Sequence, residues 1–542
     1  MQVEGALVRA PVAPVALAPP GAGVVGVGAL LLATTVLLLL LLLAERARRA
    51  YRDYLHMHKV VADMPGPPTL PLVGNLLDVV AGGDDYIYDN ICRLVARHGP
   101  TVRVWLGPEL VVGITDPRDV EFVATSQELI DKSPFYGVLE PLLGLGLSCL
   151  GGQEVRRHRK IVMPSLHLDI LHDFVDTFRR EALRFADRLE QHADDGEVFD
   201  VAPLCVEYSL AAALQTIMST ELDDAGDEGR REFGGWLQGA MDVFMYRVWR
   251  PWFLNDTLFR LSGRHDQYVR TTAALNGFTE AIIVDKRQQL AARKPSDATE
   301  APRRPRRRAF LDNILDSEEG SALTDSELRD EVKTLLCTGA ETSASTLSFV
   351  LMVLSLRQDI QDRLVQELDD VFGGDAADAA RPVTMEELPH LQYLERVIKE
   401  TLRMFPVLPF FTRSCPRDWL PSGHTAPRGA HLTFFLPALH SDPRVWPEPR
   451  RFDPDRFLPE RSCGRHPFSY LPFSAGPRNC VGQRYAMLLL KVEVATLLRR
   501  FRVLAPDDTA DVPGRDIADV PIKVTLVIAV KGGVRIRVQR RH

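Results

Sequence analysis

The distribution of apolar residues separates one leucine-rich stretch from a long remainder of mixed character. Residues 21–44 are 24 consecutive positions without a charge. As a helix this stretch would extend about 36 Å, enough to cross a hydrocarbon core of about 30 Å. A cleaved signal peptide would have a shorter apolar segment, a better cleavage site and more positive charge in front of it. We therefore predict a transmembrane anchor at 21–44, preceded by a short lumenal N-terminus at 1–20.

Residues 45–75 combine basic charge with proline. Arg46, Arg48, Arg49 and Arg52 follow the apolar stretch directly, and the positive-inside rule places the chain beyond them in the cytosol. Residues 65–75 contain four prolines, too many for a helix. The pattern predicts a basic and proline-rich hinge at 45–75 and a single-pass protein of the endoplasmic reticulum membrane.

Residues 76–542 predict one domain that is mainly α with small β-sheets. A capping box, Thr324 with Glu327, should begin a long helix whose apolar positions suit the protein interior. Short strand-like runs occur at Thr101–Leu106, Leu110–Ile114, Leu432–Phe435 and Val520–Val538. No internal repeat or second linker divides this region.

Charge and cysteine content exclude two classes of protein. The formal net charge is −7, and the arginine-rich run at 293–308 is interpreted as a solvated loop, so nucleic acid is not an expected partner. Seven scattered cysteines without a C-x-x-C pair fit reduced cytosolic thiols.

One of these cysteines lies in a distinctive loop. The run from Phe473 to Gly482 reads F-S-A-G-P-R-N-C-V-G, with Cys480 at its centre. An isolated cysteine in a Gly/Pro-rich loop is usually structural, but five fixed positions together are rare by chance. The run resembles the signature of the cytochrome P-450 superfamily of haem-thiolate monooxygenases.

This resemblance implies a cofactor, haem b, and roles for the loop residues. Cys480 would supply the axial thiolate, Arg478 would contact a propionate and Phe473 would belong to the cofactor site. Gly476 would let the backbone turn tightly beneath the porphyrin. Gly482 would let a helix at about 481–500 pack closely against the ring, and the N–H groups at its start would stabilise the sulfur anion.

Two other segments match the superfamily in order and separation. Glu400 and Arg403 share one helical face in an E-x-x-R pattern. The run 452–457 resembles the family's meander, from which Arg456 would complete a structural charge triad that holds the loop before the cysteine.

The long helix contains an acid–alcohol pair, Glu341 and Thr342, shortly after Gly339. A hydroxyl that bonds back to the preceding turn is the ordinary interpretation of such a pair. The resemblance implies instead an oxygen-activating kink, with Gly339 loosening the helix over the haem. Thr342 would then hold a water, and Glu341 would pass protons from solvent.

Two arginines match the positions of propionate ligands in the superfamily. Arg413 lies in a predicted strand, and Arg159 lies in a predicted early helix. The tryptophan often found four residues before the second arginine is replaced by Val155, which places one propionate hydrogen bond in question.

Basic residues near the cysteine suggest a docking face for NADPH-cytochrome P-450 reductase, with cytochrome b5 as a second electron donor. Solvated charge is the alternative interpretation. The residues are Arg156, Arg157, Lys160, Arg484 and Lys491.

Within the superfamily, the chain is most similar to family 4, which is associated with ω-hydroxylation of fatty acids. The runs 158–167, 381–388 and 393–406 carry this similarity. Many family 4 members have a glutamate before the helix glycine that bonds covalently to haem, whereas this chain has Thr338. We therefore predict non-covalent haem, and strict ω-selectivity is in question.

Three segments are predicted to line an apolar pocket: residues 406–411, residues 133–150, and an aromatic set from Met241 to Phe253 that is interpreted as an access channel, a membrane-dipping segment or ordinary packing. The resulting hypothesis is a membrane-anchored monooxygenase that inserts one oxygen atom of O2 into a lipophilic substrate. A hydroperoxide isomerase without reductase and a non-catalytic haem sensor or carrier are the alternatives.

Overall fold

The structure is a computed structural model that describes residues 22–218, 227–292, 309–374, 381–418, 423–506 and 517–541. The chain forms two compact units, residues 1–59 and 60–542. The predicted lumenal segment 1–20 and the arginine-rich run 293–308 lie outside the described residues.

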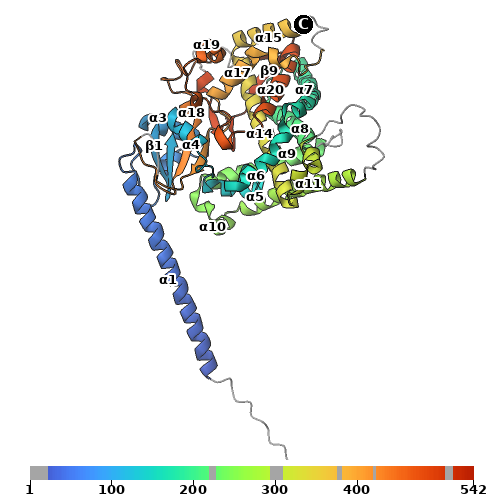
Figure 1. The fold of residues 1–542 in the computed structure, drawn as a ribbon. Coiled ribbons are helices and arrows are strands. Elements are labelled where there is room, and N and C mark those ends of the chain that lie inside the picture. Colours follow the sequence, from blue (N-terminus) through green and yellow to red (C-terminus); the bar gives the residue numbers. More distant parts are fainter. Residues whose placement is uncertain are drawn as a thin grey trace, which may run out of the picture. The chain divides into compact units, whose positions relative to one another are not determined.

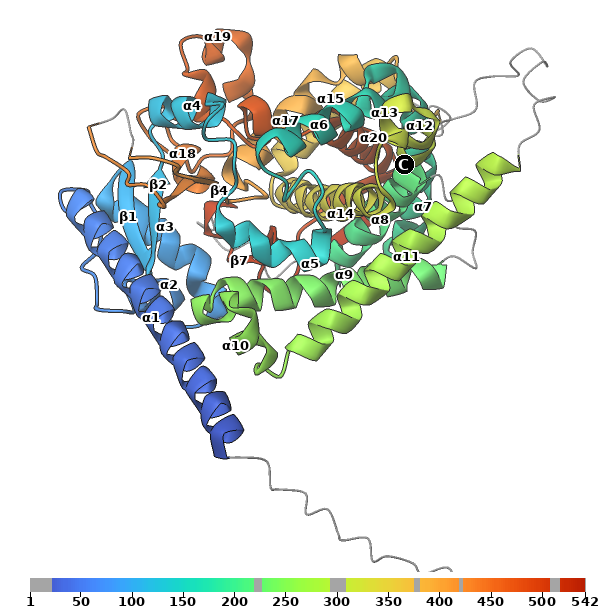
Figure 2. The same cartoon turned by 60° about the horizontal axis from the view of Figure 1, so that its bottom comes forward.

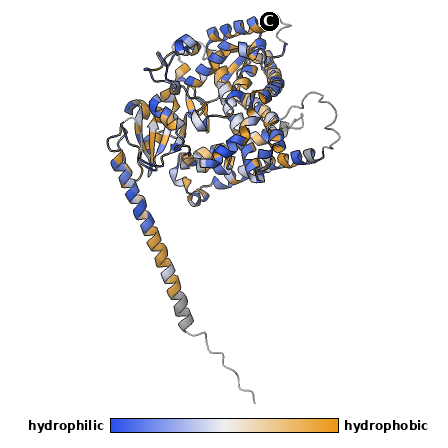
Figure 3. Cartoon of the chain, in the orientation of Figure 1, coloured by the Kyte–Doolittle hydropathy of each residue, from blue (hydrophilic) through white to orange (hydrophobic). Residues whose placement is uncertain are grey.

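The first unit consists of helix α1, Ala22–Val60. Its apolar part and the hydrophilic part that follows are distinct in Figure 3, and the leucines from Leu30 to Leu43 are exposed. The hinge predicted to begin at residue 45 is helical as far as Val60. This differs from the prediction because residues 45–64 contain no glycine or proline, and Glu45 pairs with Arg49 one turn later at 2.8 Å.

The second unit is mainly helical, as predicted (Figure 1). Its longer helices are α3 (Ile87–His98), α4 (Pro117–Thr125), α6 (Gly152–Val162), α7 (Leu168–Asp195), α8 (Ala202–Met218), α9 (Asp227–Val248), α11 (His265–Ala291), α12 (Phe310–Asp316), α14 (Asp325–Leu356), α15 (Gln358–Phe372), α17 (Gln392–Met404) and α20 (Gln483–Arg500). The short helices are α2 (Leu76–Val80), α5 (Glu140–Leu143), α10 (Asp256–Arg260), α13 (Glu318–Ser321), α18 (Leu436–Leu439) and α19 (Pro459–Ser462).

Three small sheets complete this unit. The largest has the strand order β1-β2-β5-β4, with β1 (Thr101–Leu106), β2 (Glu109–Ile114), β4 (Phe410–Ser414) and β5 (His431–Phe435). Only the β2–β5 pair in it is parallel. The order β3-β9-β6 joins β3 (Phe199–Asp200), β9 (Arg535–Arg540) and β6 (Phe501–Leu504), and β7 (Ile522–Val524) pairs with β8 (Ile528–Val530).

The predicted strand-like run 520–538 is therefore three strands instead of one. Gly532 and Gly533 both have positive φ, of 83° and 84°, and turn the chain between β8 and β9. A Cβ on Gly533 would collide with the carboxylate of Asp200, so only glycine fits that turn.

Helix α14 is the central element of the second unit (Figure 2). It begins with the predicted capping box, in which Thr324 and Glu327 exchange hydrogen bonds of 3.3 and 2.8 Å. Its first half packs in one apolar cluster with α8, α9 and α12, and its second half packs in another with α7, α15, α17 and α20. Burial on all sides explains why a helix of membrane-like hydropathy lies inside this unit.

Candidate active site

Cys480 lies in a loop that its backbone and Gly476 hold in place. The N–H of Cys480 donates to the carbonyl of Phe473 at 2.8 Å. Gly476 has φ of +68°, and a Cβ there would collide with the carbonyl oxygen of Ala124, at the end of α4. The glycine thus permits a close approach to α4. The predicted position of this turn beneath a porphyrin stays a prediction.

The thiol of Cys480 has accessible surface although protein atoms surround it. Burial raises its pKa, while the N–H of Gly482 and the positive charge of Arg159 act in the opposite direction. Helix α20 starts at Gln483, two residues later than predicted, because Gly482 is its N-cap.

Arg159, on α6, contacts the cysteine loop. Its Nη1 donates to the carbonyl of Asn479 at 2.8 Å, and its Nη2 donates to the Asn479 side chain. Burial lowers the pKa of Arg159. The side chain therefore fixes the residue before Cys480, and the predicted contact with a propionate remains a prediction.

Three cations face one another between β4 and the cysteine loop. Arg413 is 2% exposed, and among the described residues it donates only to the carbonyl of its neighbour Thr412. Burial and the charge of Arg413 lower the pKa of Arg478 to about 10, and both of its Nη atoms are buried without a hydrogen-bond partner. Lys132 completes the group. Burial and the positive charges of Arg478 and Arg413 hold the pKa of Lys132 well below the usual range.

Lys132 was not identified from the sequence. It immediately precedes the segment 133–150 that was expected near the pocket, but an isolated lysine gives no sequence signal for burial. Its ammonium lies 4.3 Å from the ring centre of Tyr136, a favourable cation–π distance. The three cations, called here the cation cluster, have no carboxylate bonded to any of them in the described part of the chain.

A cavity of about 260 Å³ lies beside the cation cluster. Segments from all three predicted regions contribute to its wall, including Tyr136, Trp249 and Phe410. Trp252 belongs to the predicted aromatic set from Met241 to Phe253, but it does not line this cavity and is 51% exposed. Among the cavity-lining residues, only Lys132, Tyr136 and Glu341 have ionisable side chains. The wall is otherwise apolar or carries hydroxyl groups.

The acid–alcohol pair reaches this cavity from α14. Thr342 and Thr338 each donate their hydroxyl to the carbonyl four residues earlier, at 2.7 Å. Helix α14 runs through Gly339 without a break, so the loosening predicted at this glycine is not seen. Burial, reinforced by the negative charge of Asp242, raises the pKa of Glu341 to about 7.

The structure brings Glu400, Arg403 and Arg456 together. Arg403 donates Nε and Nη2 to the two carboxylate oxygens of Glu400 at 2.7 and 2.9 Å. Arg456 Nε lies 3.3 Å from Glu400, close enough for an ion pair although not aligned for a hydrogen bond. Glu400 also accepts from the N–H of Asp453 at 2.9 Å. All three charged side chains are buried, and we call them the charge triad.

A buried contact between His158 and Glu331 joins α6 to α14. Like the position of Lys132, it was not predicted from the sequence. His158 Nδ1 lies 2.6 Å from a carboxylate oxygen of Glu331, and each side chain is 1% exposed. Because the next residue, Arg159, holds Asn479, α6 connects the central helix with the cysteine loop. His158 lies in a basic run, and nothing in that pattern indicates a buried partner.

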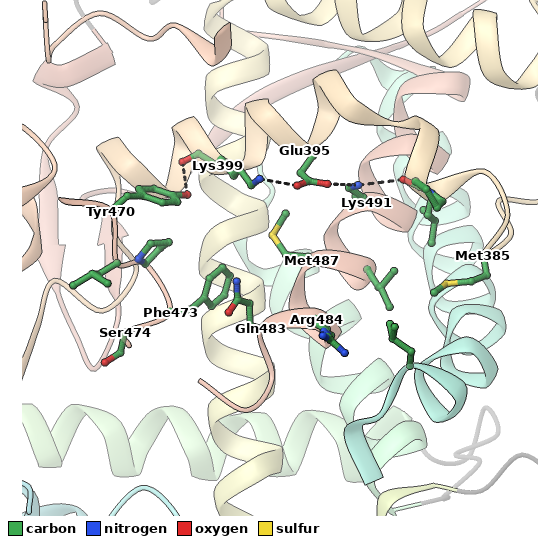
Figure 4. A pocket seen from close by; sticks show the side chains of 16 residues that line it. Met385, Glu395, Lys399, Tyr470, Phe473, Ser474, Gln483, Arg484, Met487 and Lys491 are labelled. Atoms are coloured by element: carbon green, nitrogen blue, oxygen red, sulfur yellow. Dashed lines mark hydrogen bonds and ion pairs between the residues drawn. The ribbon is translucent and has the colours of Figure 1, made fainter. Parts of the chain in front are cut away.

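Phe473 does not line the cavity beside the cation cluster. It lies at a second hollow between α17, α20 and residues 470–474, shown in Figure 4. There Glu395 accepts from Lys399 at 2.7 Å and from Lys491 at 2.8 Å. Lys491 is only 6% exposed, so its predicted place on a docking face is wrong: the ammonium is used inside the protein. Arg484 at the same hollow is exposed.

The chain is similar to known proteins along most of its length. The family model described as cytochrome P450 matches residues 64–520. The chain is 33% identical over 482 residues to cytochrome P450 4V2 of Homo sapiens, covering 87% of this chain and 88% of that protein. It is 31% identical over 554 residues to cytochrome P450 4g15 of Drosophila melanogaster, covering 90% and 93%. The crystal structure of the cytochrome P450DA heme domain matches the fold with a TM-score of 0.73 and 21% identity, over 88% of this chain and 98% of that one.

Proposed function

The chain belongs to the cytochrome P450 family, as a relative of family 4, and from this membership we propose that Cys480 is the thiolate ligand in a membrane-anchored monooxygenase acting on lipophilic molecules. The family assigns the chemical class: a haem-thiolate monooxygenase with non-covalent haem b. We propose the residues that carry out this chemistry, and also the substrate, the electron donor and the membrane anchor.

The cation cluster fits haem b. Arg413 is buried and Lys132 and Arg478 are partly buried. With no carboxylate bonded to them in the described part of the chain, these three cations repel one another and need negative charge nearby. The two carboxylates of haem b supply it, and the free Nη atoms of Arg478 suit a propionate. This is the observation that carries the proposal. The Thr338 hydroxyl donates to Thr334 and offers no carboxyl group for a covalent bond.

Helix α20 and Arg159 support Cys480 as the anionic ligand. The Gly482 N–H and the Arg159 charge both favour the thiolate over the thiol. A Cβ on Gly482 would lie 3.9 Å from the sulfur, an ordinary contact distance, so Gly482 is next to the thiol. When bound, haem b activates dioxygen, and the thiolate ligand donates electron density that favours O–O cleavage.

Glu341 and Thr342 are our candidates for proton delivery. A carboxyl with a pKa of about 7 can hold a proton and release it near neutral pH. Because Thr342 donates its own proton to Thr338, its Oγ1 can still accept a hydrogen bond from a water molecule. The pair would therefore position water and exchange its protons with Glu341.

The substrate proposal rests on the cavity wall. Aromatic and aliphatic side chains dominate it, and burial of apolar surface would be the main source of affinity. If Lys132 is engaged with the cofactor, no fixed positive charge remains in the wall for an anionic group. We therefore propose lipophilic substrates such as fatty acids, lipid hormones or xenobiotics, bound mainly through their apolar parts.

Electron delivery and membrane attachment complete the proposal. NADPH-cytochrome P450 reductase, with cytochrome b5 as a second donor, would dock at the exposed cations Arg156, Lys160 and Arg484, without Lys491. The exposed leucines of α1 would cross the endoplasmic reticulum membrane, with residues 45 onward in the cytosol.

The first experiment is a carbon monoxide difference spectrum of the dithionite-reduced protein beside Cys480→Ser. We expect a strongly red-shifted Soret band that the substitution removes. Haem-loaded, folded protein without such a band would exclude Cys480 as the ligand.

The second experiment is Thr342→Ala in the reductase-supported reaction, where we expect NADPH consumption to continue with less product. Unchanged coupling would refute the role of Thr342, and turnover of a hydroperoxide without reductase would favour an isomerase.

A further inference from the structure

The residues on either side of Lys132 bind to the sheet that contains β4 and β5. The carbonyl of Asp131 accepts from the N–H of Ser414, the last residue of β4, at 2.9 Å. The hydroxyl of Ser133 lies 2.6 Å from Nδ1 of His431, the first residue of β5. The backbone of Lys132 is therefore held between two contacts with the same sheet.

These two contacts also determine where Lys132 lies relative to Arg413. Ser414 and His431 lie opposite each other in the antiparallel β4–β5 pair. Arg413 directly precedes Ser414 in the chain. The contact with His431 is buried, because Ser133 is 1% exposed and the histidine is 2% exposed. One cross-strand pair thus brings the segment with the lysine to the strand with the arginine.

A carboxylate holds the other side of the His431 ring. Nε2 of His431 lies 2.8 Å from a carboxylate oxygen of Glu109, the first residue of β2. An ionised carboxylate only accepts hydrogen bonds, so Nε2 carries the proton, and in the neutral ring Nδ1 accepts from the Ser133 hydroxyl. The Ser133 oxygen accepts in turn from the N–H of Phe135 at 3.3 Å. The Phe135 ring stacks on His431 with 4.3 Å between ring centres.

Serine, histidine and glutamate bonded in this order also occur in nucleophilic catalysis. A nucleophile must reach its substrate, however, and Ser133 is 1% exposed. The cavity beside the cation cluster is lined by its neighbours Lys132, Phe135 and Tyr136, and Ser133 is not among the lining residues. The serine therefore supports the residues beside it and takes no direct part in the chemistry.

We propose that His431 is a positioning residue for the haem site. Glu109 fixes its ring, and its Nδ1 holds Ser133 so that the preceding residue, Lys132, faces the two arginines of the cation cluster. Like charges repel, so a lysine on a mobile segment would move away from the arginines before haem binds. An anchored segment keeps the ammonium in place and lowers the entropic cost of binding an anion there. The inference rests on the proposed contact between the cation cluster and the haem propionates.

The two ring nitrogens of His431 can be tested separately in the haem-loaded full chain. The amide of asparagine lies near the position of Nδ1, whereas the amide of glutamine reaches the position of Nε2. His431→Asn can therefore keep the contact with Ser133, and His431→Gln can keep only the contact with Glu109. Both variants lose the ring that stacks on Phe135, so each is a control for the other.

Transfer of haem to an excess of a haem-binding acceptor protein measures the release rate. We expect His431→Gln to release haem about threefold to tenfold faster than the unaltered protein. His431→Asn should stay within about twofold of the unaltered rate, because it retains the bond to the serine. Equal release from the two variants would overturn the proposal.

A double-mutant cycle tests whether the effect passes through Lys132. We expect about threefold to tenfold faster haem release from Ser133→Ala and at least about tenfold faster release from Lys132→Met. The double variant should release haem no faster than Lys132→Met alone. Ser355→Ala removes another buried serine hydroxyl, which donates to the Met352 carbonyl at 2.7 Å, and should leave the rate unchanged. Two single effects that multiply would overturn the proposal.

A variant at the surface covers the case in which the buried variants do not fold. The Glu109 side chain is 42% exposed, and we expect Glu109→Ala to release haem about twofold to threefold faster, because the His431 ring loses one of its anchors. An unchanged rate would overturn the proposal. Haem transfer does not depend on the carbon monoxide band that tests Cys480. An unchanged rate in Lys132→Met with that band intact would therefore refute the positioning role and leave the thiolate ligand in place.

Discussion

The charge triad is buried and the cation cluster is partly buried, and the charges of the two groups are compensated in different ways. In the triad, Glu400 accepts from Arg403 and from a backbone N–H and lies beside Arg456. Arg403 also donates to the carbonyls of His440 and Pro449. In the cluster, Arg478 leaves two buried Nη atoms without an acceptor. The triad contains its own carboxylate, whereas no carboxylate bonds to the cluster in the described residues.

This difference separates a structural role from a binding role. Buried charge is costly unless it is paired, so a fully paired group can fix a fold at little net cost. An unpaired group of like charges opposes folding and gains free energy only when a ligand of opposite charge binds. The first arrangement holds residues 447–456 against α17. We propose that the second prepares a site for the two propionates of haem b.

The largest effect is expected from breaking the triad. Glu400→Gln leaves two buried guanidinium groups without their carboxylate, which we expect to destabilise the protein by about 3–5 kcal/mol. Chemical denaturation of the haem-loaded protein measures this change. The control is Glu128→Gln, which removes an exposed partner of Arg417 at 2.7 Å and should cost about 0–1 kcal/mol. Equal effects of the two substitutions would contradict the structural role of the triad.

The next largest effect is expected in the cation cluster. There the substitution should weaken haem binding and should not lower the stability of the haem-free protein. Arg478→Gln removes one of three mutually repelling charges, so the stability of the haem-free protein should stay the same or increase. Haem binding should weaken by about 1.5–3 kcal/mol, the value of hydrogen bonds to a charged group. Transfer of haem to an excess of a haem-binding acceptor protein measures the release rate. Faster unfolding of the haem-free protein with unchanged haem release would reverse our assignment.

A smaller effect is expected at the contact between His158 on α6 and Glu331 on α14. Burial acts to lower the pKa of His158, but its bond with Glu331 outweighs burial, and the net pKa is raised. A histidine with a raised folded pKa contributes stability below its unfolded pKa and loses it as pH rises through the folded value. We expect His158→Phe to cost about 1–2 kcal/mol near pH 6 and less near pH 8.5. Denaturation at both pH values tests this, with the exposed His172→Phe as the control.

The last prediction is a pH-dependent effect of Glu341, an ionisable carboxyl in an apolar wall. Its folded pKa of about 7 exceeds the ordinary value of 4.5, so the folded protein binds this proton more tightly than the unfolded chain. Its contribution to stability is present below about pH 4.5 and is lost as pH rises to 7. Glu341→Gln should flatten the decline of the unfolding temperature between pH 5 and 7.5. An unchanged pH profile would show that the carboxyl is not desolvated.

The sequence by itself determined the family, the fold class and the positions of the main chemical groups. Local patterns sufficed for α14, since a capping box and an apolar run specify a helix wherever it packs. The cysteine loop and the triad could be found because their members occupy fixed positions in short segments. The predictions of a hinge from residue 45 and of one strand-like run at 520–538 were wrong, because turns and helix ends depend on single residues.

Only the tertiary structure decided which charges meet. Lys132 joins Arg413 and Arg478 from a segment about 280 to 350 positions away in the chain, and Lys491 turns inward to Glu395. His158 likewise finds Glu331 across two helices. Burial and the distance between charges set both pKa and function, and these quantities depend on the packing of remote segments. No local pattern of residues contains that information.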